Sequence, residues 1–165
     1  MNKIPILFCV FLCFISGEQG LFAQKVSKVS FSELQNKLKQ SPGDSITVVN
    51  FWATWCRPCV KELPYFEQFH QQEKQAKVRI WLVSLDFPED VDKKLIPFVK
   101  QRKLSCPVFY LNERNPNDWV NQVAEEWSGA IPATVLYDVK GQKKAFHAGE
   151  FDYAGLKKWI SENGN

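Results

Sequence analysis

The chain has 165 residues, which is room for one domain and little more. Apolar residues make up 45% of it, enough for a core, and charged residues make up 24%, as in a soluble surface. The net charge of +3 is spread along the chain without a basic block, which argues against nucleic acid as a partner.

The N-terminus has the pattern of an export signal. Lys3 precedes an apolar run over residues 4–15, and a mixed stretch leads from there to Ala23. This pattern predicts a signal peptide over residues 1–23 and a mature domain over 24–165, exported to the periplasm. The run is shorter than the roughly 18 residues that a spanning helix needs. The alternative is an uncleaved segment that anchors the protein to the membrane.

The number and spacing of the cysteines indicate a chemically reactive pair rather than a set of structural disulfides. After such processing three remain, Cys56, Cys59 and Cys106, which are too few for a fold stapled by disulfides. Cys56 and Cys59 form a close Cys-x-x-Cys pair, whose short loop would constrain the unfolded chain only weakly. We therefore expect an exported protein to use this pair chemically. Cys106 is expected to be a small buried apolar residue, with a regulatory thiol as the alternative.

Helix-like and strand-like segments alternate along the rest of the chain. Apolar residues at three- and four-residue spacing indicate the helices, with Ser30 and Asp152 as capping residues. Helices are predicted over 30–40, 58–75, 90–103, 116–127 and from 152 on, and strands over 46–52, 78–87, 107–111, 133–138 and 143–148. Pro97 interrupts the third of these helices and indicates a kink or a later start.

The order of these segments predicts the architecture. The nearly continuous apolar residues of 46–52 are typical of a strand buried on both faces. Lys140, Gly141 and Gln142 indicate a hairpin between the last two strands. The chain is therefore predicted to form an α/β fold with a central mixed sheet flanked by helices, parallel at first and antiparallel at the closing hairpin.

Two segments resemble the signatures of the thioredoxin superfamily. Residues 51–59, Phe-Trp-Ala-Thr-Trp-Cys-Arg-Pro-Cys, resemble its active-site motif, and residues 129–134, Gly-Ala-Ile-Pro-Ala-Thr, resemble its cis-proline loop. Asn50 and Glu62 resemble in particular the TlpA/ResA-like branch of exported thiol–disulfide oxidoreductases. The resemblance covers about residues 30–160. It implies a thioredoxin-like fold with an insertion between the active-site helix and the cis-proline loop.

The Cys-Arg-Pro-Cys motif at a strand-to-helix junction predicts a redox-active dithiol. Cys56 is predicted to be the nucleophile, because unpaired N–H groups and the helix dipole stabilise a thiolate there. Arg57 adds an exposed positive charge, and Pro58 is tolerated in the first helical turn, which needs no donor at that position. Cys59 is predicted to be the resolving thiol. The alternative is a static structural disulfide.

Glu62 is predicted to take and return the proton of Cys59. The two residues are three positions apart, so they share one face of the predicted helix. Familiar thioredoxins place an acid at the position of Asn50, which cannot titrate, and the resemblance implies the proton-carrying role for Glu62. The alternative is an ordinary solvated helix glutamate.

The loop around Pro132 is predicted to face the substrate. The resemblance implies that the Ile131–Pro132 bond is cis and lies against the cysteines, leaving backbone groups of Ile131 to pair with an extended substrate segment. An ordinary turn proline is the alternative. Trp55 is predicted to add an apolar docking surface, whereas Trp52 is predicted to lie in the core. The predicted substrate-binding residues are Trp55, Arg57, Pro58, Ile131 and Pro132.

Together these features predict an exported monomeric enzyme that exchanges disulfides with protein substrates, more in the direction of a reductase. Its redox group is the Cys56–Cys59 disulfide, with no organic cofactor and no metal. The resemblance implies a membrane thiol carrier as reductant and a possible role in cytochrome c maturation.

Three alternatives belong to other classes. A copper-binding chaperone would use the two cysteines with a histidine, but the expected mature chain has neither a second cysteine pair nor two histidines at the fixed spacing of a closed metal site. A non-catalytic binding domain would have no need of both cysteines. A peroxide-reducing enzyme would not need a resolving cysteine so close to the nucleophile.

Overall fold

The computed structural model describes residues 25–40, 43–74 and 77–164. The strands are β1 (Val26–Val29), β2 (Ile46–Trp52), β3 (Val78–Ser84), β4 (Val108–Leu111), β5 (Ala133–Tyr137) and β6 (Lys143–Ala148). The helices are α1 (Phe31–Lys39), α2 (Arg57–Gln72), α3 (Ile96–Arg102), α4 (Val120–Val123) and α5 (Tyr153–Asn163), with short helical turns η1 (Pro88–Asp90), η2 (Val91–Leu95) and η3 (Pro116–Asp118). The predicted signal peptide, residues 1–23, lies outside the described residues.

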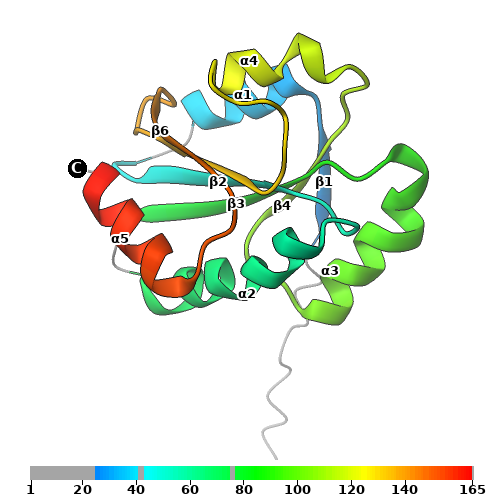
Figure 1. Cartoon of the computed structure of the whole chain (residues 1–165), viewed down its shortest axis with the longest axis horizontal. Helices are drawn as coiled ribbons and strands as arrows, with labels where there is room; N and C mark the ends of the chain where they lie inside the picture. The colour runs from blue at the N-terminus through cyan, green and yellow to red at the C-terminus, as the bar shows by residue number, and fades with distance from the viewer. Residues whose placement is uncertain (1–24, 41–42, 75–76, 165) are drawn as a thin grey trace, which may run out of the picture.

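These strands form one mixed sheet in the order β1-β4-β3-β2-β5-β6. The first four strands in this order are parallel, β5 pairs antiparallel with β2, and β6 pairs antiparallel with β5. Helices α2, α3 and α5 cover one face of the sheet, and α1 and α4 cover the other (Figure 1). The predicted α/β fold with a mixed sheet and a closing hairpin is confirmed.

Strand β2 runs through the middle of the sheet and is buried on both faces, as its sequence predicts. Val48 and Trp52 pack under the α2 face, and Val49 and Phe51 pack under the α1 face, each with at most 1% of its surface exposed. Asn50 points to the α2 face and is equally buried. A buried polar side chain needs hydrogen-bond partners, so Asn50 indicates that other polar groups lie on the α2 face of the sheet.

The predicted helix starts are confirmed by their caps. The hydroxyl of Ser30 accepts a hydrogen bond from the backbone N–H of Glu33, whose carboxylate accepts one from the Ser30 N–H, at 3.2 and 2.7 Å. Asp152 accepts a hydrogen bond from the Gly155 N–H at 2.7 Å and so begins α5. Each bond satisfies an N–H group that has no partner inside its helix.

The structure differs from the prediction in four places. The sequence reading missed β1, a short edge strand, and the strand predicted over 78–87 ends at Ser84. The helix predicted over 90–103 begins with η1 and the π-helical η2, because Pro97 has no N–H with which to extend a regular α-helix backward. The helix predicted over 116–127 is wrong, since α4 has four residues and Ala124 is extended. There the burial of Trp119 and Trp127 against the sheet overrides the helical spacing.

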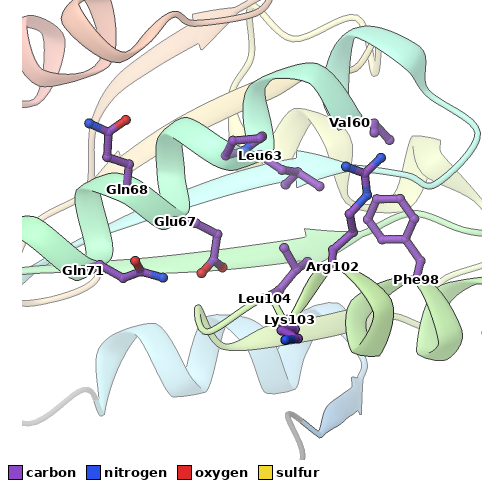
Figure 2. Close-up of a pocket in the computed structure, with 10 residues that line it drawn as sticks. Val60, Leu63, Glu67, Gln68, Gln71, Phe98, Arg102, Lys103 and Leu104 are labelled. Carbon is purple, nitrogen blue, oxygen red and sulfur yellow. The ribbon is translucent and has the colours of Figure 1, made fainter.

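A buried carboxylate ties α2 to the segment that leads into β4. Glu67 accepts hydrogen bonds from the Ser105 N–H at 2.8 Å, the Ser105 hydroxyl at 2.5 Å and the Cys106 N–H at 2.9 Å. Its side chain leaves α2 toward Leu104 beneath a hollow of about 300 Å³ (Figure 2). Cys106 is fully buried, and burial raises the pKa of its thiol far above the usual value. The expectation of a small buried apolar residue is confirmed.

Replacing Glu67 with alanine is expected to lower the free energy of unfolding by about 2–3 kcal/mol, because the buried Cys106 N–H and the partly buried Ser105 N–H lose their acceptor. Gln68→Ala is the control, since the neighbouring Gln68 donates its hydrogen bond to the exposed Gln72. It should lower the free energy of unfolding by about 0.5 kcal/mol or less. Urea denaturation measures both values, and equal losses would contradict the role given to Glu67.

Candidate active site

The two cysteines lie where β2 passes into α2. Cys56 is the N-cap residue of α2 and Cys59 lies in its first turn, with their sulfurs bonded at 2.01 Å. The Cys59 N–H donates to the Cys56 sulfur at 3.3 Å. Cys56 keeps 6% of its surface exposed and Cys59 none. The sulfur that a partner can reach is therefore that of Cys56, in keeping with its predicted role as nucleophile.

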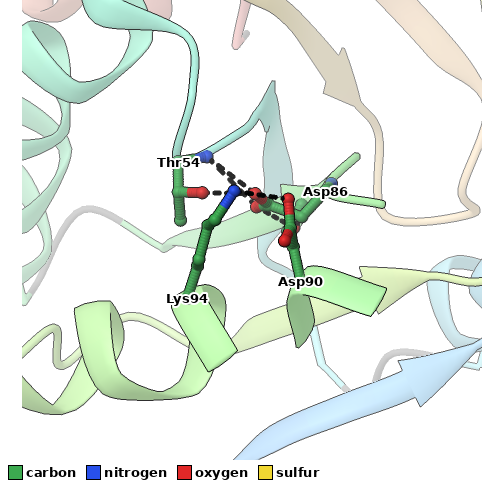
Figure 3. Close-up of polar contacts among 5 residues, drawn as sticks. Thr54, Asp86, Asp90 and Lys94 are labelled. Carbon is green, nitrogen blue, oxygen red and sulfur yellow. Dashed lines mark hydrogen bonds and ion pairs between the residues drawn. The ribbon is translucent and has the colours of Figure 1, made fainter. Parts of the chain in front are cut away.

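The loop before Cys56 is fastened to β3 by Asp86, a residue that the sequence reading missed. Asp86 is 4% exposed and accepts hydrogen bonds from the Thr54 N–H at 3.1 and 3.2 Å, from the Thr54 hydroxyl, and from the Ser84 hydroxyl at 2.8 Å. Figure 3 shows Thr54 and Asp86 facing each other, beside the ion pair of Asp90 and Lys94. Asp86 falls inside the strand predicted over 78–87, so no local signal in the sequence marks it.

Asp86→Ala is expected to lower the free energy of unfolding by about 2 kcal/mol and to slow disulfide exchange, because buried donors next to the active-site loop lose their acceptor. Asp90→Ala is the matched control, since Asp90 lies close by but pairs with the largely exposed Lys94 at 2.9 Å. Its loss should be about 0.5 kcal/mol. Thermal unfolding and exchange assays compare the two variants, and equal behaviour would contradict this role for Asp86.

Glu62 lies in α2, the helix that begins at the cysteine pair, and its side chain is fully buried. One carboxylate oxygen accepts a hydrogen bond from the Asn50 amide at 2.7 Å, and the other accepts one from the Phe151 N–H at 2.8 Å. Burial raises the pKa of Glu62 to about 7, although both hydrogen bonds act in the opposite direction and Glu150 adds to the increase. The alternative of a solvated helix glutamate is therefore wrong. A carboxyl group with this pKa can hold or release a proton near neutrality.

Asn50 is arranged to serve both protonation states of Glu62. Its amide nitrogen also donates to the Thr134 hydroxyl at 3.1 Å. Its side-chain oxygen is buried and has no hydrogen-bond partner among the described residues. A half-turn of the amide would point this oxygen at Glu62, where a protonated carboxyl group could donate to it. Asn50 can thus remain hydrogen-bonded to Glu62 whether or not the carboxyl carries its proton.

The loop before β5 faces the disulfide. The Ile131–Pro132 peptide bond is cis, as predicted, and the Ile131 carbonyl oxygen lies 3.8 Å from the Cys56 sulfur. Pro132 is buried and Ile131 is partly exposed. The loop around Pro132 therefore lies within contact distance of the Cys56 sulfur, and its backbone borders the active site.

The rim around Cys56 contains the other predicted binding residues. Trp55 precedes Cys56 and is 53% exposed, whereas Trp52 is fully buried in the core, as predicted. Arg57 and Pro58 occupy the exposed start of α2. The exposed side chains of Trp55 and Arg57, one aromatic and one positively charged, thus directly precede and follow Cys56 in the chain.

The described residues contain neither a metal-binding cluster nor a membrane-spanning helix. No group of three or more histidine, cysteine, aspartate or glutamate side chains in this part of the chain could hold a metal ion. No helix within the described ranges is both long and apolar enough to cross a membrane.

Comparison with known proteins places the chain in a family. A family model described as the AhpC/TSA family matches residues 22–144. The chain belongs to the AhpC/TSA family. Within the chain's relatives, the thiol-disulfide oxidoreductase ResA of Bacillus cereus is 32% identical over 161 residues, covering 86% of this chain and 87% of the relative. The sporulation thiol-disulfide oxidoreductase A of Bacillus subtilis is 29% identical over 117 residues, covering 70% and 67%.

Solved structures similar to this AhpC/TSA family member share its fold. StoA from Bacillus subtilis aligns with a TM-score of 0.55 at 27% identity, covering 73% of this chain and 85% of StoA. A thioredoxin-related protein from Neisseria meningitidis serogroup B aligns with a TM-score of 0.62 at 26% identity, covering 76% and 89%. The fold is thioredoxin-like, and the chain is a thiol–disulfide oxidoreductase of the ResA/StoA type, as predicted.

Proposed function

We propose that the enzyme acts outside the cytoplasm and reduces disulfides of protein substrates through Cys56 and Cys59. The observation that carries this proposal is the Cys56–Cys59 disulfide at the start of α2, with the fully buried Glu62 on the same helix as a carboxyl group whose pKa burial raises to about 7. When ionised, Glu62 disfavours a further negative charge on the nearby buried thiol. This disfavours the reduced pair relative to the disulfide, which makes the dithiol a better reductant.

The proposed reaction conserves electrons and protons. The Cys56 thiolate bonds to one sulfur of the client disulfide, and the client's second sulfur leaves as a thiolate. Cys59 then gives its proton to Glu62 and bonds to Cys56, which releases the client's first sulfur. Two electrons pass from the enzyme to the client, whose two sulfurs leave as thiolates. One thiolate regains the Cys59 proton through Glu62 or solvent, the other takes a proton from solvent, and the disulfide seen between Cys56 and Cys59 is the product state.

The proposed location and partners rest on sequence patterns. The export signal over 1–23 supports a periplasmic protein, with the membrane-anchored form as the alternative. The proposed clients are protein disulfides, including apocytochrome cysteines, and a membrane thiol carrier is proposed to restore the dithiol. The two sulfurs carry the electrons, so the proposed reaction needs no organic cofactor and no metal. The protein is proposed to work as a monomer.

A redox titration of the Cys56–Cys59 pair tests the direction of electron flow. A reduction potential near that of thioredoxin, about −270 mV, would support a reductase. A potential near that of the oxidant DsbA, about −120 mV, would contradict the reductive direction. The titration can follow the two alkylatable thiols in equilibrium with glutathione or dithiothreitol buffers.

A further inference from the structure

Two large aromatic side chains are exposed together beside the reactive sulfur. Trp55 and Phe87 are 53% and 54% exposed, and their rings stack with centroids 5.9 Å apart at an interplanar angle of 21°. Trp55 comes from the loop before Cys56, and Phe87 comes from the loop after β3. Single exposed apolar residues are common on protein surfaces, but a stacked pair next to an active site indicates an interaction surface.

The pair borders a groove that continues from the active site. The groove has a volume of about 610 Å³, within the range of ligand-binding pockets. Much of its lining is apolar, including Trp55, Phe87, Pro88, Trp119, Val120 and Ile131. Ile131 closes the end near the disulfide, since its carbonyl oxygen lies 3.8 Å from the Cys56 sulfur. The groove and the reactive sulfur therefore share one wall.

The geometry of disulfide exchange determines what can occupy this groove. A client must bring its own sulfur into bonding contact with Cys56, so the chain on either side of the client cysteine has to cross the surrounding surface. An extended chain advances at most about 3.6 Å per residue, so the Cα atom two positions away lies within about 7 Å of the Cα atom of the reacting cysteine. Trp55 and Ile131, the neighbours of Cys56, form the near end of the groove. A side chain at that distance can therefore enter it.

We propose that this groove binds an aromatic or large aliphatic side chain of the client, about two residues from the reacting cysteine, and so selects among client proteins. The inference rests on the proposed exchange with protein disulfides and adds a specificity to it. Phe87 would be the principal selecting residue, because it is exposed, forms the outer wall and lies outside the Cys-Arg-Pro-Cys motif.

Pairs of symmetrical peptide disulfides test the proposal. The peptides of a pair are identical except for phenylalanine or alanine two residues before, or two residues after, the single cysteine. The reduced full-length protein is mixed with each peptide, and the second-order rate constant of exchange is measured. The wild type is expected to favour the phenylalanine peptide by roughly tenfold at one of the two positions, as one apolar contact in a pocket allows.

Two variants locate the preference. Phe87→Ala is expected to reduce the ratio of the two rate constants to roughly twofold or less. Val139→Ala is the matched control, because Val139 is 41% exposed and lies in the distant turn between β5 and β6, and it should keep the wild-type ratio. A wild type without preference, or a Phe87→Ala variant that keeps it, would overturn the inference.

Two further outcomes distinguish failure of the groove inference from failure of the proposed function. If the reduced protein exchanges with no peptide and no protein disulfide at all, the proposed function fails. If exchange occurs at equal rates with both peptides, only the groove inference fails. Sedimentation equilibrium checks a different occupant: a wild-type dimer that Phe87→Ala dissociates would make the groove an interface between two copies of the chain and would overturn the inference.

Discussion

Replacing Cys59 with serine is expected to leave client proteins attached to Cys56 through a mixed disulfide. Cys56, the more accessible of the two cysteines, keeps its place at the N-terminus of α2, so it can still attack. Release of the client requires the second sulfur, which the variant lacks. Turnover should therefore fall by about three orders of magnitude or more, while covalent adducts accumulate. Non-reducing electrophoresis and mass spectrometry detect the adducts and map them to Cys56.

The reciprocal variant is the control for this experiment. Cys56→Ser removes the accessible nucleophile and leaves Cys59, whose side chain is fully buried. It should give neither turnover nor adducts. Adducts on Cys59 in this variant, or none on Cys56 in Cys59→Ser, would reverse or remove the assignment of nucleophile and resolving thiol.

Glu62→Gln is expected to change both catalysis and the pH dependence of stability. The resolving step loses its proton acceptor, so turnover at neutral pH should fall by about 10²-fold, the lower end of the range for general acid–base catalysis. The rise of turnover around pH 7, where Glu62 loses its proton, should disappear. Stopped-flow exchange measured from pH 5 to 9 gives both results. Glu125→Gln, at an exposed position, is the control and should keep the wild-type profile.

The stability effect of Glu62 has a definite sign. The pKa of Glu62 is about 7 in the folded protein against an ordinary value of 4.5. Between these pH values the folded protein holds a proton that the unfolded chain has released, so the free energy of unfolding falls as pH rises through this window. The fall attributable to this group is about 3 kcal/mol.

Urea denaturation between pH 4 and 8 measures this contribution as the difference between the wild type and Glu62→Gln. The variant should lack the fall between about pH 4.5 and 7, because its amide does not titrate. Its new amide can donate to the otherwise unpartnered side-chain oxygen of Asn50, which favours a folded variant. Parallel curves for the two proteins would contradict the buried titration of Glu62.

The sequence predicted the elements whose signals are local. Strand β2 is predicted with its observed bounds because the residues from Ile46 to Trp52, apolar except for Thr47 and Asn50, are typical of a strand buried on both faces. The caps at Ser30 and Asp152 could also be predicted from the sequence. Each side chain accepts a hydrogen bond from a backbone N–H only three positions further along the chain. The helix expected over 116–127 failed because burial of Trp119 and Trp127 is decided by the sheet they pack against.

The residues of the candidate site likewise fall into those that a local sequence pattern predicts and those that it does not. Cys56, Cys59 and the cis-proline loop carry recognisable motifs, and Glu62 was found through its spacing from Cys59. Asp86 and Phe87 were missed, because their importance arises from β3 ending beside the active-site loop. That proximity comes from the pairing of β2 with β3, which brings Trp52 opposite Ser84. A single sequence gives no local sign of such a contact.

The central claim is that Cys56 and Cys59 pass two electrons to a client disulfide and close a disulfide of their own. The most direct measurement incubates the reduced protein with a protein disulfide substrate, quenches with acid, alkylates all thiols and counts the modified cysteines of both partners by mass spectrometry. Cys56 and Cys59 are expected to lose their two thiols as the client gains two, while Cys106 stays reduced. A Cys56–Cys59 pair that keeps its original state while the client is reduced, or a client that gains no thiols, would contradict it.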